Sequence, residues 1–147
     1  MKPVFLRYCL RTALLLAFAA HNAFANPQTV HLGLAVVDKS IPESVRESFD
    51  DDDGKVPMKS VSVDLNNDNN PEKLIPNEFL CGNGGCPWLI YSTKLNKVIG
   101  HLFGNTVVVL DASTAGYKDI QTRWSQGAGQ TGSAVYRFRN GAYEKVD

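Results

Sequence analysis

The sequence predicts an all-β protein, an antiparallel meander of two propeller-blade-like or sandwich units with one short N-terminal helix. Strand-like segments follow one another almost without interruption from Ser60 to the end of the chain. Turn residues separate these segments at short intervals, which is typical of antiparallel sheets. A loop rich in Asp and Asn also recurs as a looser copy 47 residues later, and a period of this size is typical of β repeats.

Residues 1–25 have the features of a secretory signal peptide. Three cations, Lys2, Arg7 and Arg11, precede an apolar run over 13–20, and Ala23-Phe24-Ala25 offers the small residues of a cleavage site. The apolar run is far shorter than the roughly 20 residues of a transmembrane helix. We therefore expect a periplasmic or secreted protein with no membrane span after cleavage, in which 26–147 form a single secreted β-rich domain.

The charge that remains after cleavage argues against nucleic acid as a partner. Loss of the three N-terminal cations lowers the number of Lys and Arg from 15 to 12, against 15 Asp and Glu, so 26–147 carry a net charge of −3. Nucleic-acid binders usually show a strongly basic surface. The sequence therefore favours other classes of partner.

Two cysteines remain after cleavage, Cys81 and Cys86, separated by a glycine-rich stretch. In an exported protein such a pair predicts a disulfide bond. A zinc site is disfavoured because no histidine lies near the pair in the sequence. The catalytic alternative is that Cys86 acts as a nucleophile with His101 as its base. A disulfide at Cys86 would prevent this.

The first elements are a strand and a helix. The Val- and Leu-rich residues 29–37 predict a first strand. Ser40 and Glu43 form a capping box, which predicts a helix over 41–49. Its apolar face is formed by Ile41, Val45 and Phe49. The acidic run 50–53 then ends the helix as a solvated turn, with a second cation site as the alternative.

The remaining elements are all predicted strands. They cover 60–64, 72–76, 87–92, 97–102, 106–110, 119–124, 132–139 and 142–146. Between the last two, Asn140-Gly141 is a strong signal for a hairpin with a two-residue type I′ turn.

The segment 64–72, Asp-Leu-Asn-Asn-Asp-Asn-Asn-Pro-Glu, is the strongest candidate site. Oxygen-bearing side chains recur at alternate positions and a carboxylate closes the run. They belong to Asp64, Asn66, Asp68, Asn70 and Glu72. Hard oxygen ligands on a tight loop are what Ca²⁺ requires. The alternative is a structural Asx turn, in which Asp and Asn bond to their own backbone.

This loop resembles the calcium loop of FG-GAP/VCBS-type repeats in integrin-like propellers. The resemblance implies side-chain ligands at Asp64, Asn66 and Asp68, a backbone carbonyl ligand at Asn70 and a closing carboxylate at Glu72. Asn69 stands where that family has glycine, and Asn is the next best residue for a positive φ. The resemblance covers only short segments, and it implies local structure rather than function.

The looser copy of the loop spans 111–119. Asp111, Ser113 and Asp119 match the first, third and last positions, but Ala115 has lost a ligand. We therefore expect this copy to bind nothing. Asp111 and Asp119 could also be read as paired catalytic carboxylates, although the repeat already accounts for them.

A partner-binding site is predicted at 125–133, a stretch of small and polar residues. It reads as a loop too long for a tight hairpin, and long loops on a rigid sheet often carry binding sites. Trp124 at its base would be the buried anchor, and Gln126 and Gln130 would offer hydrogen bonds. A solvated connector with Trp124 in the core is the alternative, and the face with Tyr91 and Phe103 is the next candidate.

These features predict a non-enzymatic binding protein of the cell envelope, stabilised by a disulfide and by Ca²⁺. The two histidines after the signal peptide, His31 and His101, lie in no catalytic motif. The partner would be an unknown envelope protein or glycan. The alternative function is a periplasmic inhibitor or immunity protein that blocks the active site of a cell-wall (peptidoglycan) hydrolase.

Overall fold

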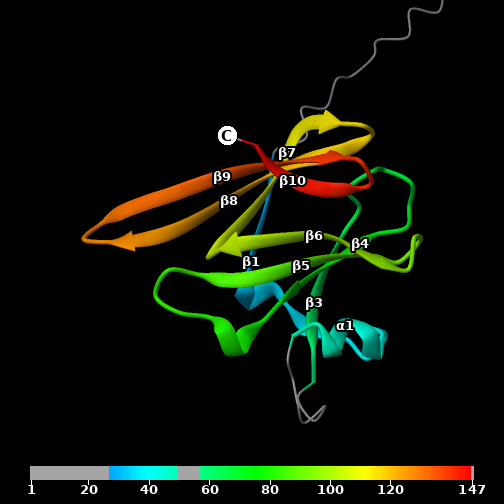
Figure 1. Ribbon diagram of the computed structural model, residues 1–147, viewed down its shortest axis with the longest axis horizontal. Helices are drawn as coiled ribbons and strands as arrows, with labels where there is room; N and C mark the ends of the chain where they lie inside the picture. The colour runs from blue at the N-terminus through cyan, green and yellow to red at the C-terminus, as the bar shows by residue number, and fades with distance from the viewer. Residues whose placement is uncertain (1–26, 50–56, 147) are drawn as a thin grey trace, which may run out of the picture.

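The computed structural model describes residues 27–49 and 57–146, so the predicted signal peptide and the acidic run 50–53 lie outside the described residues. Its strands form two five-stranded antiparallel sheets, and the predicted all-β fold is confirmed (Figure 1). Sheet I has the order β1-β7-β8-β9-β10 and sheet II the order β2-β3-β4-β5-β6. β2 to β6 and β7 to β10 each follow one another in chain order within their sheet, as in a meander, and β1 joins the edge of sheet I beside β7.

All eight strands predicted after Ser60 are present. In chain order the elements are β1 Gln28–His31, the 3-10 helix η1 Leu32–Leu34, β2 Val36–Val37, α1 Glu43–Glu47, β3 Lys59–Val63, β4 Glu72–Pro76, the 3-10 helix η2 Glu78–Leu80, β5 Cys86–Ser92, β6 Lys97–Gly104, β7 Thr106–Thr114, β8 Tyr117–Gly127, β9 Gln130–Arg139 and β10 Ala142–Val146.

The predicted strand over 29–37 is instead a crossing between the sheets. β1 pairs with β7 of sheet I, η1 turns the chain, and β2 pairs with β3 of sheet II. Val30 is fully buried, whereas Val36 and Val37 are exposed. The run of Val and Leu that suggested one strand therefore contains two short strands with different surroundings.

The predicted helix exists but is shorter, because its capping box does not form. Pro42 occupies the N-cap of α1, and the Ser40 hydroxyl donates to Asp38 Oδ1 at 2.7 Å instead. The apolar face is as predicted, since Ile41 and Val45 are buried with Phe49 packed against them. No helix in the described ranges is both long and apolar enough to cross a membrane.

The main core contains side chains from both sheets. Sheet II supplies residues such as Leu74, Trp88 and Ile99, and sheet I residues such as Val107 and Ile120. A second apolar cluster joins Ile41 and Val45 to the other face of sheet II. Sheet II is therefore covered on both faces, which explains why all of β4 is buried.

A partly buried ion pair holds the segment before α1 against sheet II. Lys73 of β4 contacts Asp38 at 2.5 Å and also bonds to the Ser40 hydroxyl, while Ser60 Oγ donates to Asp38 Oδ2 at 2.6 Å. Burial alone would raise the pKa of Asp38. The hydrogen bonds from Lys73, Ser60 and Ser40 outweigh burial and hold this pKa well below its usual range.

The two sheets meet at a tight corner between β6 and β7. Gly104 ends β6 there, and a side chain at this position would lie 2.7 Å from the carbonyl oxygen of Arg123 in β8. The indole N–H of Trp88 donates to the Gly104 carbonyl at 3.0 Å. This close approach brings the end of β6 beside the middle of β8.

Candidate cation loop and partner-binding face

The 64–72 segment joins β3 to β4, and the Val63–Glu72 strand pair closes it. Asn67 and Asn69 adopt positive φ values of 56° and 62°. Asn tolerates this left-handed conformation better than most residues. The positive φ expected of Asn69 is confirmed.

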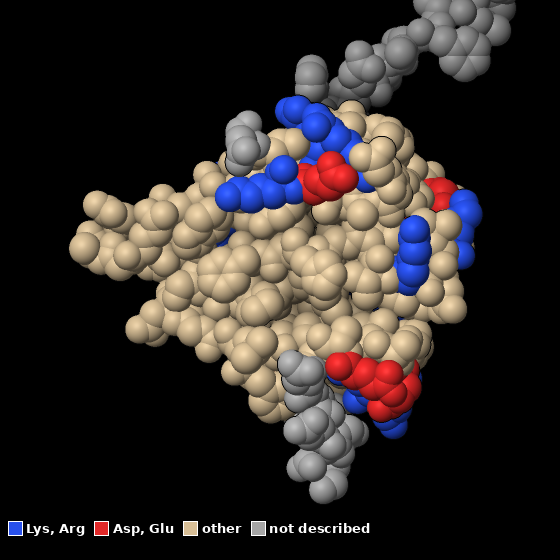
Figure 2. All heavy atoms as spheres, in the orientation of Figure 1, with Lys and Arg blue, Asp and Glu red and all other residues tan. Residues whose placement is uncertain are grey.

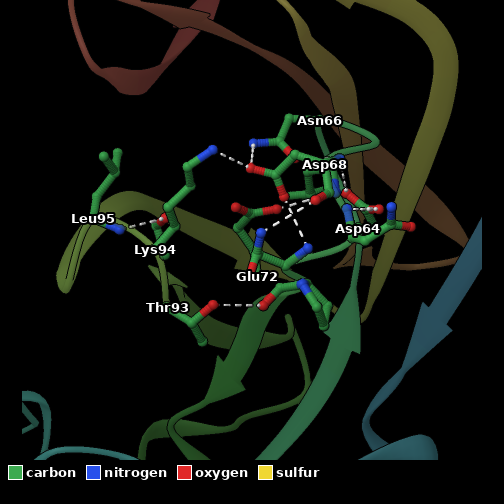
Figure 3. Close-up of polar contacts among 12 residues, drawn as sticks. Asp64, Asn66, Asp68, Glu72, Thr93, Lys94 and Leu95 are labelled. Atoms are coloured by element: carbon green, nitrogen blue, oxygen red, sulfur yellow. Dashed lines mark hydrogen bonds and ion pairs between the residues drawn. The ribbon is translucent and has the colours of Figure 1, made fainter.

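The carboxylates of the loop accept hydrogen bonds from its own backbone. Asp64 accepts from the N–H groups of Asp68 (3.2 Å) and Asn69 (3.0 Å), and Asp68 accepts from Asn70 (2.8 Å). Asn66 Oδ1 also accepts from Asp68 at 3.1 Å. These are the bonds of the Asx-turn interpretation. They also gather side-chain oxygens at one loop, as Figure 3 shows for Asp64, Asp68 and Glu72.

Glu72 lies beneath these residues and is fully buried. Its Oε2 accepts from the N–H of Leu65 at 3.0 Å, but its Oε1 has no hydrogen-bond partner among the described residues. Burial raises the pKa of Glu72, and the nearby charges of Asp68 and Asp64 add to the effect. A buried carboxylate oxygen without a partner is energetically unfavourable, and a cation would satisfy it.

The turn between β5 and β6 contacts this loop. Lys94 Nζ lies 2.8 Å from Asp68 Oδ2, and Thr93 Oγ1 donates to the Pro71 carbonyl at 3.1 Å (Figure 3). The hydrogen bond from Lys94 is the main reason why the pKa of Asp68 is lowered. Asn70 is exposed, and its side-chain amide donates to the Asp68 carbonyl.

Calcium at this loop remains a prediction. Across 27–49 and 57–146, no group of three or more His, Cys, Asp and Glu side chains is placed to hold a metal ion. A cation would therefore need amide and backbone oxygens beside the carboxylates, which Asn66 and Asn70 can supply. The unpartnered Oε1 of Glu72 is the observation that fits such an ion.

The looser copy at 111–119 has a different local structure. Asp111 and Ser113 belong to β7, and a two-residue turn at Ala115 and Gly116 leads directly into β8. Asp119 is buried and pairs with Arg137 at 3.2 Å, while Asp111 is exposed. The two carboxylates therefore have different surroundings, and Asp119 has a structural partner.

The prediction of a long loop over 125–133 is wrong. β8 continues to Gly127 and β9 begins at Gln130, so Ala128 and Gly129 alone make the turn, with φ values of 48° and 77°. A two-residue type I′ turn needs positive φ at both positions, and Asn-Gly is the pair that usually meets this requirement. Gln126 and Gln130 are exposed near the tip of this hairpin, which projects from the body of the molecule (Figure 1).

Trp124 is partly buried at the base of the hairpin. Its indole lies across Gly132, where any side chain would overlap the ring. The ring of Phe103 meets it edge-on, with 6.4 Å between centroids. Of the second candidate pair, Tyr91 is buried in the helix-covered cluster and only Phe103 is exposed.

Sequence reasoning missed two exposed apolar residues in the segment before Cys81. Phe79 and Leu80, in η2, are 64% and 63% exposed. Leu80 lines a shallow pocket with Pro87, and Pro87 lies directly opposite Phe103 in the β5–β6 ladder. We call Phe79, Leu80, Phe103 and Trp124 the aromatic face. The signal in the sequence was an apolar pair in the short stretch between the predicted strand 72–76 and Cys81.

At its Trp124 end the aromatic face borders an uncharged region. Figure 2 shows that the side of the molecule with the projecting hairpin and the 81–86 loop is nearly free of Lys, Arg, Asp and Glu in this view. The stretch 124–136 contains no charged residue. Interface centres are typically aromatic and poor in charge, so this region has the composition of a binding surface.

The predicted disulfide is confirmed. Cys81 and Cys86 are bonded, with 2.05 Å between the sulfur atoms. The loop that they close touches the hairpin, since the N–H of Ser125 donates to the Gly84 carbonyl at 3.1 Å. Cys86 is therefore no free thiol, and the nucleophile interpretation with His101 is excluded.

No family model, curated protein or solved structure matches this chain. The resemblance to FG-GAP/VCBS-type repeats therefore rests on the residues of the loop alone. Since a fold does not by itself specify a function, the function has to be argued from the loop and the aromatic face.

Proposed function

We propose that this chain is an exported, non-enzymatic binding protein of the cell envelope. Its β scaffold is stabilised by the Cys81–Cys86 disulfide and by Ca²⁺ at the 64–72 loop, and it captures an envelope protein or glycan through the aromatic face. The observation that carries the proposal is the exposure of three large apolar side chains, Phe79, Leu80 and Phe103, the last of which packs edge-on against Trp124.

Exposed apolar residues are common singly, but a cluster of large ones marks a place where another molecule binds. Burying one such side chain contributes about 1.5–3 kcal/mol. Phe79 and Leu80 sit on a short segment held in place from both ends, by the side chain of buried Asn77 and by the disulfide at Cys81. Little conformational entropy is therefore lost when a partner covers them.

Capture from an envelope extract tests the role of the aromatic face. The double variant Phe79→Ser, Leu80→Ser removes its most exposed members, and Val36→Ser, Val37→Ser is a matched control in β2. Since all four side chains are exposed, both variants should retain nearly the original Tm. The original protein and the control should retain the same partner, while the aromatic-face variant loses it. Equal retention by all three proteins would contradict the proposal.

The alternative function is inhibition of a cell-wall hydrolase, and the projecting β8–β9 hairpin favours it. Its exposed tip around Ala128 and Gly129 is narrow and uncharged (Figure 1), so it could enter a substrate cleft. Inhibition assays against a panel of peptidoglycan hydrolases distinguish the two functions. Stoichiometric inhibition of one hydrolase would favour the inhibitor, whereas capture of a partner without inhibition favours the binding protein.

A further inference from the structure

We propose that Lys94 is an internal competitor for the cation at the 64–72 loop. Its ammonium group holds Asp68 while the loop is free of a cation, and it leaves Asp68 when a divalent cation binds. This inference rests on the cation site of the proposed function, and it goes further by naming the residue that regulates the site.

The two positive groups need the same carboxylate. Lys94 Nζ lies 2.8 Å from Asp68 Oδ2, and a bound Ca²⁺ would lie roughly 2.3–2.6 Å from an oxygen of its ligand. An ammonium group and a divalent ion on one carboxylate would therefore stand within a few ångströms of each other and repel strongly. Binding of the ion at Asp68 thus requires that Lys94 moves away.

Lys94 can move without disturbing the fold. Its side chain is 56% exposed, whereas that of Asp68 is 21% exposed, so the ammonium group can pass directly into water. The backbone of its turn has other anchors, namely the Thr93–Pro71 hydrogen bond and a bond from the N–H of Leu95 to Ser92 Oγ. The exchange therefore needs only the flexible Lys side chain to change its position.

The buried carboxylate of Glu72 explains why a divalent ion would be preferred to the ammonium group of Lys94 at this loop. Lys94 reaches Asp68 at the outside of the loop, while Glu72 Oε1 remains without a hydrogen-bond partner within the described residues. A divalent ion bound between Asp68 and Glu72 would compensate both carboxylates at once. One ammonium group at the loop surface compensates only the outer one.

Titration of the full purified protein with CaCl₂, followed by calorimetry, tests the inference. Lys94→Gln removes the competitor, Lys94→Arg keeps the charge, and Lys97→Gln is a control in the neighbouring strand. Lys94→Gln should lower the Kd for Ca²⁺ about fivefold, near the upper end of the contribution of an exposed ion pair. Lys94→Arg and Lys97→Gln should bind like the original protein.

Two other results would overturn the inference in different ways. Equal or weaker Ca²⁺ binding by Lys94→Gln would mean that the ion binds without displacing Lys94, and the cation site itself would stand. Absence of both binding heat and a Tm shift in the original protein and in Lys94→Gln would overturn the cation site as well. The capture experiment on the aromatic face does not depend on either result.

Discussion

Two carboxylates, the partly buried Asp38 and the fully buried Glu72, have opposite effects on the pH dependence of folding. The pKa of Asp38 is depressed, so its stabilising contribution is present above the ordinary value of 3.8 and is lost as the pH falls through the lower folded value. The pKa of Glu72 is raised above 4.5, so its charged form destabilises the fold at neutral pH. That penalty disappears as the pH falls through the raised value towards 4.5.

Glu72→Gln should therefore have opposite effects with and without calcium. In chelator at neutral pH it removes the buried charge, and we expect a stability increase of roughly 1 kcal/mol, or a few degrees in Tm. In millimolar CaCl₂ the Tm of the original protein should rise by mass action, and that of the variant should not. Differential scanning calorimetry measures all four values.

The pH provides a control for this prediction. Below the raised pKa Glu72 of the original protein is protonated, so the difference in Tm between the two proteins in chelator should shrink as the pH is lowered. A variant that is less stable than the original protein in chelator at pH 7 would show that the charge of Glu72 is not a penalty. The hydrogen bond from Leu65 would then be the dominant contribution of this residue.

At the residue level, local patterns predicted what depends on local chemistry. The positive φ of Asn69 and the disulfide followed from residue type and spacing. The burial of Glu72 and its contact with Leu65 did not, because they depend on how β4 packs between other elements. Lys94 was missed for the same reason, since it lies 26 residues from Asp68.

Among the elements, the β8–β9 hairpin shows how composition can mislead. Ser, Gly and Ala over 125–133 offer no apolar pattern, yet the segment forms two strands because both continue ladders begun by buried residues such as Ile120 and Tyr136. The helix shows the converse case. Its apolar spacing was predicted, but Ser40 bonds to Asp38, two residues earlier, rather than to the helix. Such competition by a neighbouring side chain does not show in a capping pattern.

Shortening the hairpin tests whether it takes part in binding. Trp124 and Gly132 are directly opposite each other, so Asn-Gly in place of 125–131 would close the ladder with a two-residue turn. Every removed side chain is exposed, and we expect a loss of only about 1 kcal/mol, mainly from the Ser125–Gly84 hydrogen bond. Partner capture should fall sharply if the hairpin belongs to the site.

A matched variant keeps the length of the hairpin and changes its chemistry. Gln126→Ser with Gln130→Ser retains both strands but removes the two amide groups. Capture that is lost in the short variant and kept in this one would show that the shape of the hairpin matters more than its amides. Full capture by both variants would leave the hairpin as a connector and the aromatic face as the whole site.

For the whole molecule, the 81–86 loop connects the two sheets where partner binding is proposed. The disulfide closes this loop at Cys86, the first residue of β5 in sheet II, and Gly84 accepts a hydrogen bond from Ser125 of sheet I. The corner at Gly104 reinforces this junction, because the N–H of Asn105 donates to the Arg123 carbonyl at 2.7 Å. The cation loop lies on the opposite side of the molecule (Figure 1), so the two sites can be tested separately.

Removal of the disulfide should therefore weaken partner capture without changing calcium binding. In the chain-entropy description a loop this short contributes about 2 kcal/mol, so Cys81→Ala with Cys86→Ala should lower the Tm and leave the protein folded. Calcium binding should be unchanged, because the 64–72 loop has no contact with the 81–86 loop among the hydrogen bonds of the described residues. Capture should weaken, because Phe79, Leu80 and Ser125 lose their common support. Calorimetric titration and capture measured on the same preparation distinguish these effects. Weakened calcium binding would show that the disulfide supports the whole fold rather than the aromatic face alone. Undiminished capture would show that the aromatic face is rigid without the disulfide.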